Sequence, residues 1–189
     1  MNENIFFNVN ELKHCGKNVI IGKTVRIRNP ELVEIGDNCI IDDFTYISGK
    51  LILGSGVHIG ANTTFQAGKS SIKIDDYTGI SSGCRFFAVS SDYLASEIDL
   101  PTLPIDFTID NQTTFNDNIE VGKACLIGAN SIVLPGVTIP IGSSFGAASK
   151  ISNRNYKEFS FYMNDCKKVI SKRNKLKLIE QLNKLNSHE

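Results

Sequence analysis

The polar side chains best suited to chemistry lie in or beside one segment, residues 87–118, which is rich in Asp, Ser, Thr, Asn and Pro. Near its start, a Ser-Ser-Asp-Tyr run contains Asp92 and Tyr93. A carboxylate there can accept a charge-assisted hydrogen bond or a proton, although an Asx turn in a serine-rich loop would also explain the residue. Ser82 precedes the segment and Glu120 follows it, so both are candidates to contact the same substrate.

The five cysteines do not form a metal or disulfide pattern, because their number is odd and no CxxC pair occurs. Cys39, Cys84 and Cys125 each stand four residues after a regularly spaced apolar residue. Neighbouring repeats place Ser or Thr in that slot, so we interpret these cysteines as small core residues. No metal site is predicted.

The element that must position the polar residues is a repeat of six. Between residues 121 and 151 an apolar residue recurs at every sixth position: Val121, Ile127, Val133, Ile139, Phe145 and Ile151. The same period runs from Ile21 to Phe65 with one phase shift, and from Ile74 to Phe86 after a three-residue insertion around residues 68–71. An amphipathic helix needs a spacing of three to four and a strand a spacing of two. A period of six predicts a β-solenoid, in which each hexad forms a short flat side and a corner.

The repeat also sets the expected domain organisation. Residues 1–18 should cap the first coil, and residues 19–154 should form the solenoid, with residues 87–118 as a loop extruded from one coil. Residues 155–189 should form a C-terminal extension with a helix. Apolar residues at helical spacing from Asp165 onward predict that Asp165 is the N-cap of this helix. The helix is expected to pack on the solenoid rather than to form a coiled coil with a partner.

Composition narrows the possible partners. The 189 residues are 41% hydrophobic and have a formal net charge of +0, so a packed core is feasible and nothing attracts nucleic acid or an anionic membrane. No apolar run approaches membrane-spanning length, and the N-terminus does not resemble a signal peptide. The cytoplasm is the expected location.

The run IGANSIVLPGVTIPIGSSFGAASKI resembles the hexapeptide-repeat acyltransferases. The resemblance implies an all-β fold, a left-handed parallel β-helix, with the long extruded loop and the C-terminal α-helix added to it. The loop sequence, with Pro101 and Pro104 after the Ser-Ser-Asp-Tyr run, is similar to sugar acyltransferases of bacterial surface-polysaccharide pathways. Members of that family are homotrimers in which acyl-CoA and acceptor meet between subunits.

The resemblance also implies a site for the co-substrate, acetyl-CoA or another acyl-CoA; no permanently bound cofactor is expected. Its pantetheine arm should lie against small residues of the C-terminal coils, which correspond to Ala129 and Ala147. Its phosphates should meet Lys167 or Lys168, with Arg154 nearby. The chain departs from the family here, because the Gly and Pro of a Gly-x-Pro-Ala-Lys-like segment are replaced.

A second departure concerns the catalytic base. Many relatives carry a histidine in the extruded loop, but this chain has only His14, His58 and His188. His58 is expected to face outwards beside a corner. An alcohol needs a positioned base, and an unperturbed Asp, with a pKa of about 3.9, is a weak one. A neutral amine already carries a nucleophilic lone pair.

Together these observations predict an N-acyltransferase that acts on an amino sugar, carried on a nucleotide, with Asp92 as the catalytic candidate and Ser82, Tyr93 and Glu120 as substrate contacts. Two alternatives stay open: a sugar O-acetyltransferase, and a β-helix that serves only as a scaffold.

Overall fold

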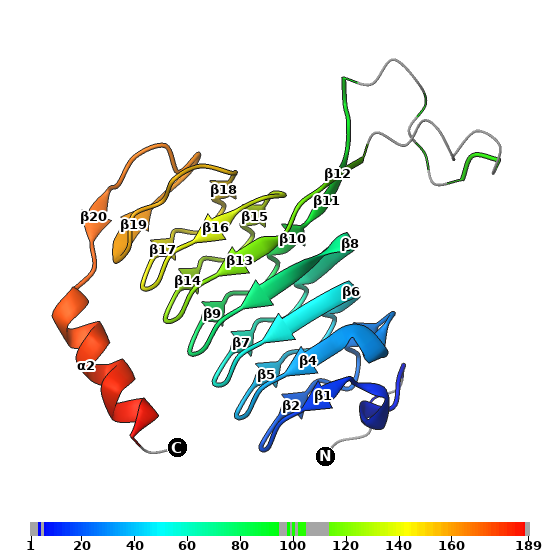
Figure 1. Ribbon diagram of the computed structural model, residues 1–189, viewed down its shortest axis with the longest axis horizontal. Coiled ribbons are helices and arrows are strands. Elements are labelled where there is room, and N and C mark those ends of the chain that lie inside the picture. Colours follow the sequence, from blue (N-terminus) through cyan, green and yellow to red (C-terminus); the bar gives the residue numbers. More distant parts are fainter. Residues whose placement is uncertain are drawn as a thin grey trace.

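The protein is a β-solenoid of about 7 turns with one C-terminal helix, as the repeat predicts (Figure 1). The computed structural model describes residues 4, 6–94, 98, 100, 102–104 and 114–187, and the statements below concern these. The predictions for His188, Pro101 and most of residues 95–113 concern residues outside this set. Strands of successive coils pair in parallel, with the register that the hexads require.

Each coil has three flat faces, named here in the order in which the chain visits them. The first face consists of β2 (Ile20–Ile21), β5 (Ile40–Ile41), β7 (His58–Ile59), β9 (Gly79–Ile80), β14 (Leu126–Ile127), β17 (Ser144–Phe145) and β19 (Ser160–Tyr162). The second face consists of β3 (Arg26–Ile27), the first parts of β6 (Tyr46–Leu53) and β8 (Thr64–Ile74), β10 (Arg85–Phe87), β15 (Ile132–Val133) and β18 (Lys150–Ile151). The third face consists of β1 (His14–Cys15), β4 (Val33–Ile35), the last parts of β6 and β8, β13 (Ile119–Val121) and β16 (Thr138–Ile139). The first corner joins the first face to the second, the second corner joins the second to the third, and the third corner leads back to the first.

The sixth-position residues fill the centre of the coil. All of them are buried: Ile21, Ile27, Ile35, Ile41, Ile47, Leu53, Ile59, Phe65, Ile74, Ile80, Phe86, Val121, Ile127, Val133, Ile139, Phe145 and Ile151. They form one continuous core, in which the rings of Phe65 and Phe86 stack with centroids 4.9 Å apart. Burial of this kind is the main source of stability in a repeat protein, because each coil contacts only its neighbours.

The cysteine prediction is confirmed. Cys39, Cys84 and Cys125 are fully buried free thiols within this core. Burial raises the pKa of Cys125 to about 12, so this thiol stays protonated at physiological pH. Among the described residues no cluster of His, Cys, Asp and Glu could hold a metal ion.

Two irregularities of the repeat are absorbed locally. The phase shift after Ile27 contains the 3₁₀ helix η2 (Pro30–Leu32). The insertion around residues 68–71 is confirmed as a bulge at the second corner: Ser48 pairs with Gln66 and Lys50 with Ser71, so one residue of β6 faces four of β8. Gly68 has a φ of +59° there, which glycine adopts without strain.

Both ends of the core are covered. At the N-terminus the 3₁₀ helix η1 (Val9–Glu11) carries a capping box between Asn8 and Glu11, and Leu12 beside it is buried. At the C-terminus Tyr156 and Tyr162 pack on Phe145, with ring centroids 5.2 and 5.3 Å from it. These aromatic rings close the last apolar rung.

The C-terminal helix begins later than the sequence suggests. Helix α2 spans Lys175–Asn186. Its N-cap is Asn174, whose side chain accepts a hydrogen bond from the amide of Lys177 at 3.1 Å. The prediction that Asp165 caps the helix is therefore wrong. Just before the helix, β20 (Ser171–Lys172) pairs with β19 and keeps the chain extended. Arg173 also donates to the carbonyl of Gly142 at 2.9 Å.

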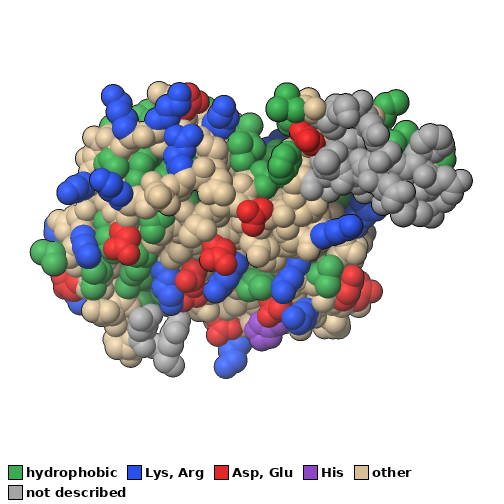
Figure 2. All heavy atoms as spheres, turned by 45° about the horizontal axis from the view of Figure 1, so that its top comes forward, with side chains coloured by type: hydrophobic (Ala, Val, Ile, Leu, Met, Phe, Trp, Pro, Cys, Tyr) green, Lys and Arg blue, Asp and Glu red, His purple; other side chains and the backbone are tan. Residues whose placement is uncertain are grey.

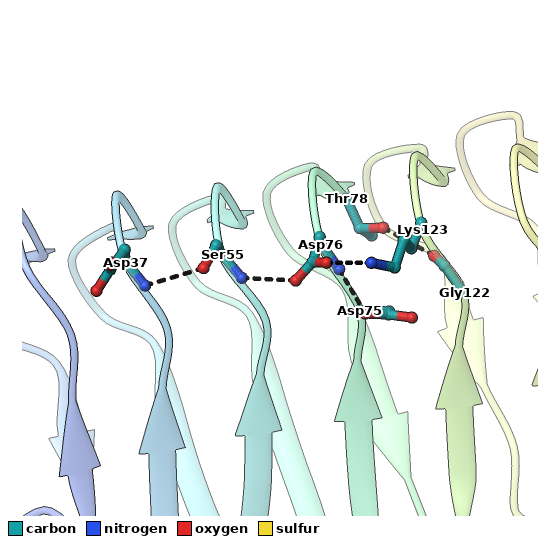
Figure 3. Close-up of polar contacts among 7 residues, drawn as sticks. All are labelled: Asp37, Ser55, Asp75, Asp76, Thr78, Gly122 and Lys123. Atoms are coloured by element: carbon teal, nitrogen blue, oxygen red, sulfur yellow. Dashed lines mark hydrogen bonds and ion pairs between the residues drawn. The ribbon is translucent and has the colours of Figure 1, made fainter. Parts of the chain in front are cut away.

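The third corner carries a polar ladder that ties successive coils together (Figure 3). The amide of Asp37 donates to Ser55 Oγ at 3.3 Å, and the amide of Ser55 donates to Asp76 Oδ1 at 2.9 Å. Lys123 Nζ then lies 2.5 Å from Asp76 Oδ2. These contacts give hydrogen-bond acceptors to backbone N–H groups at the corner, which lie between strands and have no strand partner.

One face of the molecule carries side chains of both charges. On the face drawn in Figure 2, Lys and Arg side chains are interspersed with Asp and Glu. Within the described parts of the chain, no helix is both long and apolar enough to cross a membrane.

The close stacking of coils gives a test of the fold. A Cβ added at Gly36 would lie 2.6 Å from the carbonyl carbon of Gly54, whereas one at Gly79 meets only Leu126 Cδ2, at 3.1 Å. We expect Gly36→Ala to lower the apparent Tm by roughly 5–10 °C, because backbone cannot move aside. Gly79→Ala should change it by less than about 2 °C, since a leucine side chain can shift. Equal Tm values for the two variants would contradict this coil spacing.

Candidate functional site

A groove of about 690 Å³ runs along the first face beside the first corner. Its C-terminal end is apolar, with Leu126, Phe145 and Phe161, and its other end is polar, with Asp42 and His58. Ser82 and Ala129, two residues predicted from the sequence, lie on its rim. The groove can therefore hold a ligand with one apolar and one polar part.

Ser82, Ala129 and Ala147 stack on successive coils along the first corner. The carbonyl of Ser82 accepts a hydrogen bond from the amide of Asn130 at 3.0 Å, and the carbonyl of Ala129 accepts one from the amide of Ala148 at 2.8 Å. Ala147 is exposed. A column of small residues on adjacent coils lets an extended ligand approach the backbone, which is the role predicted for Ala129 and Ala147.

Small residues also form the wall of the groove. Gly79 contributes no side chain to the outward row of the first face, between His58 and Leu126. At Gly128 a Cβ would lie 2.4 Å from the amide nitrogen of Ala147, so this corner admits nothing larger than glycine. The groove exists because side chains are missing at these positions.

Basic residues continue the column of the first corner. The carbonyl of Asn164 accepts a hydrogen bond from the amide of Lys150 at 2.8 Å, which places the turn before Lys167 one coil beyond Ala147. The Lys167 ammonium lies 3.8 Å from Asp165, in a side chain that is 74% exposed, so it is available to an anion. Lys168 is also exposed.

Arg154 lies apart from this column. It follows β18 and the second corner, where Asn153 faces Gly136. Its Nη2 donates to Ser152 Oγ at 2.7 Å, and its Nε is buried without a hydrogen-bond partner among the described residues. The structure therefore does not group Arg154 with Ala129, Ala147 and Lys167.

Asp92 and Tyr93 lie at the base of the extruded segment. This base is an antiparallel pair of strands, β11 (Val89–Ser91) and β12 (Thr114–Asn116), which leaves the coil near the second corner (Figure 1). Asp92 Oδ1 accepts a hydrogen bond from the amide of Leu94 at 2.9 Å, the contact of an Asx turn. Tyr93 is 89% exposed.

Within one chain the structure does not bring Ser82, Asp92 and Glu120 together. Ser82 lies at the first corner, while Asp92 lies beyond the second corner, at the far edge of the second face. Glu120 is exposed on the third face, between Lys73 and Thr138 of the neighbouring strands. The strand β10 of the second face therefore separates Ser82 from the start of the extruded segment.

His58 lines the groove, although it was not among the residues predicted to form the site. The outward orientation predicted for it is confirmed, and its Nε2 lies 3.0 Å from Asp42 Oδ2. The hexads contained a usable signal, because Gly60, two residues after His58, packs on Ser82: a Cβ there would lie 2.6 Å from the Ser82 amide nitrogen. Residues at the same repeat position on adjacent coils are neighbours in space.

Comparison with known proteins agrees with this architecture. Residues 33–67 match the family model "Bacterial transferase hexapeptide (six repeats)". The chain is 31% identical over 172 residues to dTDP-4-amino-4,6-dideoxy-D-glucose acyltransferase of Escherichia coli, covering 89% of this chain and 85% of that protein. A maltose O-acetyltransferase of Clostridium difficile shares only the fold, with a TM-score of 0.58 at 14% identity over 88% of this chain and 73% of that one.

Among solved structures, AntD, an N-acyltransferase from Bacillus cereus in complex with dTDP and 3-hydroxybutyryl-CoA, is similar with a TM-score of 0.84 and 30% identity, covering 98% of both chains. AntD has also been solved with a serine replaced, and with an aspartate ten positions later replaced, each time with coenzyme A bound. The chain thus belongs to the hexapeptide-repeat acyltransferases, and within that family it is close to the dTDP-amino-sugar N-acyltransferases.

Proposed function

We propose that this enzyme transfers an acyl group, most simply acetyl, from CoA to the amine of a dTDP-linked 4-amino-4,6-dideoxy sugar. The observation that carries the proposal is the pair Ser82 and Asp92. It has the same residue types and the same separation of ten as the replaced serine and aspartate of AntD. A serine variant of AntD holds dTDP-4-amino-4,6-dideoxyglucose together with coenzyme A. Cytoplasmic synthesis of a bacterial surface polysaccharide is the corresponding cellular role.

The groove supplies a place for both substrates. The acyl-CoA arm lies along its apolar end, against Ala129 and the exposed Ala147, with the phosphates towards Lys167 and Lys168. The acceptor lies towards Ser82 and the polar end. This order places the thioester near Ser82, where the two parts of the groove meet.

Asp92 completes the site from a second copy of the chain. In one chain it follows β11, beyond the second corner, whereas Ser82 lies at the first corner on the rim of the groove. Three copies around an axis would bring the loop of one chain to the first corner of the next, with closed symmetry. Asp92 would then orient the amine through a charge-assisted hydrogen bond.

The proposed nucleophile is nitrogen. No histidine occurs in the described part of the extruded segment, so an alcohol would lack a base at that position. A sugar amine has an appreciable neutral fraction near pH 8, and its attack requires chiefly positioning beside the thioester, which contributes several kcal/mol. After attack, the nitrogen carries a positive charge, and the departing thiolate or water accepts one proton from it.

We expect the protein to be a homotrimer in solution. Flat faces, and the exposed Tyr93 and Leu94 at the base of the extruded segment, favour closed association. Sedimentation equilibrium should give three times the chain mass of 20.8 kDa. A mass that stays at the monomer value at all concentrations would contradict both the trimer and the shared site.

Asp92→Asn should weaken acceptor use. If Asp92 orients the amine, the variant should raise the KM for the acceptor more than it lowers kcat. If Asp92 takes a proton, the loss should lie in kcat, by a factor of about 10² or more. Asp117→Asn is the matched control, because Asp117 also accepts a local amide hydrogen bond, from Asn118 at 2.8 Å. Unchanged kinetics for Asp92→Asn would make Asp92 an ordinary turn residue.

The choice of nitrogen is tested by a matched pair of acceptors. dTDP-4-amino-4,6-dideoxyglucose and its 4-hydroxyl counterpart are compared with acetyl-CoA across pH. We expect turnover of the amine only, because an alcohol must lose a proton of much higher pKa than that of an ammonium group as it attacks the thioester. Turnover of the hydroxyl compound without the amine would show that the enzyme is an O-acyltransferase, and turnover of neither would reject this substrate class.

A further inference from the structure

The polar end of the groove carries an imidazole paired with a carboxylate. His58 extends outward from β7, and Asp42 follows β5 on the adjacent coil, with His58 Nε2 and Asp42 Oδ2 3.0 Å apart. When Nε2 donates its proton to Asp42, the other ring nitrogen, Nδ1, carries a lone pair. A carboxylate that fixes the tautomer of an imidazole in this way prepares it to accept a proton.

The surroundings of the pair favour a cationic ligand. Asp42 and His58 are the titratable side chains among the residues that line the groove, so with neutral His58 the lining carries one negative charge. The adjacent strands present Ile40 and Gly79 beside His58. Across the first corner, Arg85 is engaged with the backbone, since its Nη1 donates to the carbonyls of Asn62 and Gly83 at 2.7 and 2.8 Å. An ammonium group is attracted to this end, and a phosphate is not.

The pair is also close to the place where the proposed reaction occurs. Gly60 lies between His58 and the first corner, and the Ser82 backbone packs directly on it. No side chain intervenes at Gly79, the strand neighbour of His58. A ligand beside Ser82 therefore reaches Nδ1 along the open groove, directly or through one water.

We propose that His58, held by Asp42, removes the proton from the protonated acceptor amine before it attacks the thioester. This inference rests on the proposed function. One N–H bond of the ammonium breaks, its proton moves to His58 Nδ1, and the electron pair remains on the amine nitrogen. That nitrogen then attacks the thioester carbonyl, the C–S bond breaks, and the thiolate takes the second amine proton. His58 returns its proton to water, which its 56% exposed side chain contacts.

If His58 removes this proton, the loss of kcat/KM caused by replacing His58 must depend on pH. Below the pKa of the acceptor amine, most of the acceptor arrives as ammonium and needs a proton acceptor. Well above it, solvent has already removed the proton. We expect His58→Gln to lower kcat/KM by about 10- to 100-fold at pH 6.5 and by less than about 3-fold at pH 9.5. Asp42→Asn should show the same trend with a smaller loss, because the amide still holds the ring but carries no charge.

The measurement is kcat/KM for the amino sugar from pH 6 to 10, with the trimer intact and circular dichroism unchanged. His14→Gln is the matched control, because His14 is exposed on the third face and outside the groove. A loss equal at all pH values, a loss confined to the acceptor KM, or no loss at all would overturn the proposal. Failure of the wild-type enzyme to acylate the amine would instead reject the proposed function.

Discussion

The constraint on which the whole structure depends is that one apolar side chain per hexad must point to the centre of the coil. Each such residue stacks on its equivalents in the coils above and below, and the backbone between them forms coil-to-coil hydrogen bonds such as Gly79 N to Cys125 O at 3.0 Å. Because every coil repeats this arrangement, equivalent residues line up about 4.8 Å apart along the axis. The corners therefore become straight columns of side chains.

On such a scaffold, positions that lack a side chain shape the site as much as the side chains that are present. Gly79 and Gly128 open the groove, while Ser82, Ala129 and Ala147 provide a column of small residues along it. The core beneath is rigid, since Ile80, Ile127 and Phe145 are buried directly below the groove. Rigid positioning of this kind suits a reaction whose nucleophile needs little chemical activation.

The same regularity explains why one chain alone is an incomplete site. A flat face separates the first corner from the extruded segment, and no bend in the coil brings them closer. Strands β11 and β12, between which the extruded segment lies, pair at the edge of the second face (Figure 1). A straight solenoid encloses a cleft most simply when a second copy packs against it. This is the physical basis for the proposed trimer.

The sequence by itself determined the solenoid, its inward residues, the core role of the cysteines and the bulge around residues 68–71, because the period of six fixes which side chains are buried. Ser82 was named because it precedes the extruded segment on a coil edge, and Ala129 was named from the resemblance to the family. The left-handed sense of the coil came from resemblance alone, because spacing carries no hand. Only the tertiary structure decided that Asp42 Oδ2 lies 3.0 Å from His58 Nε2 at the polar end of the groove, that Arg154 lies at another corner, and that α2 starts at Lys175. These depend on which residues of distant hexads become neighbours, and on the pairing of β20 with β19, which local periodicity does not contain.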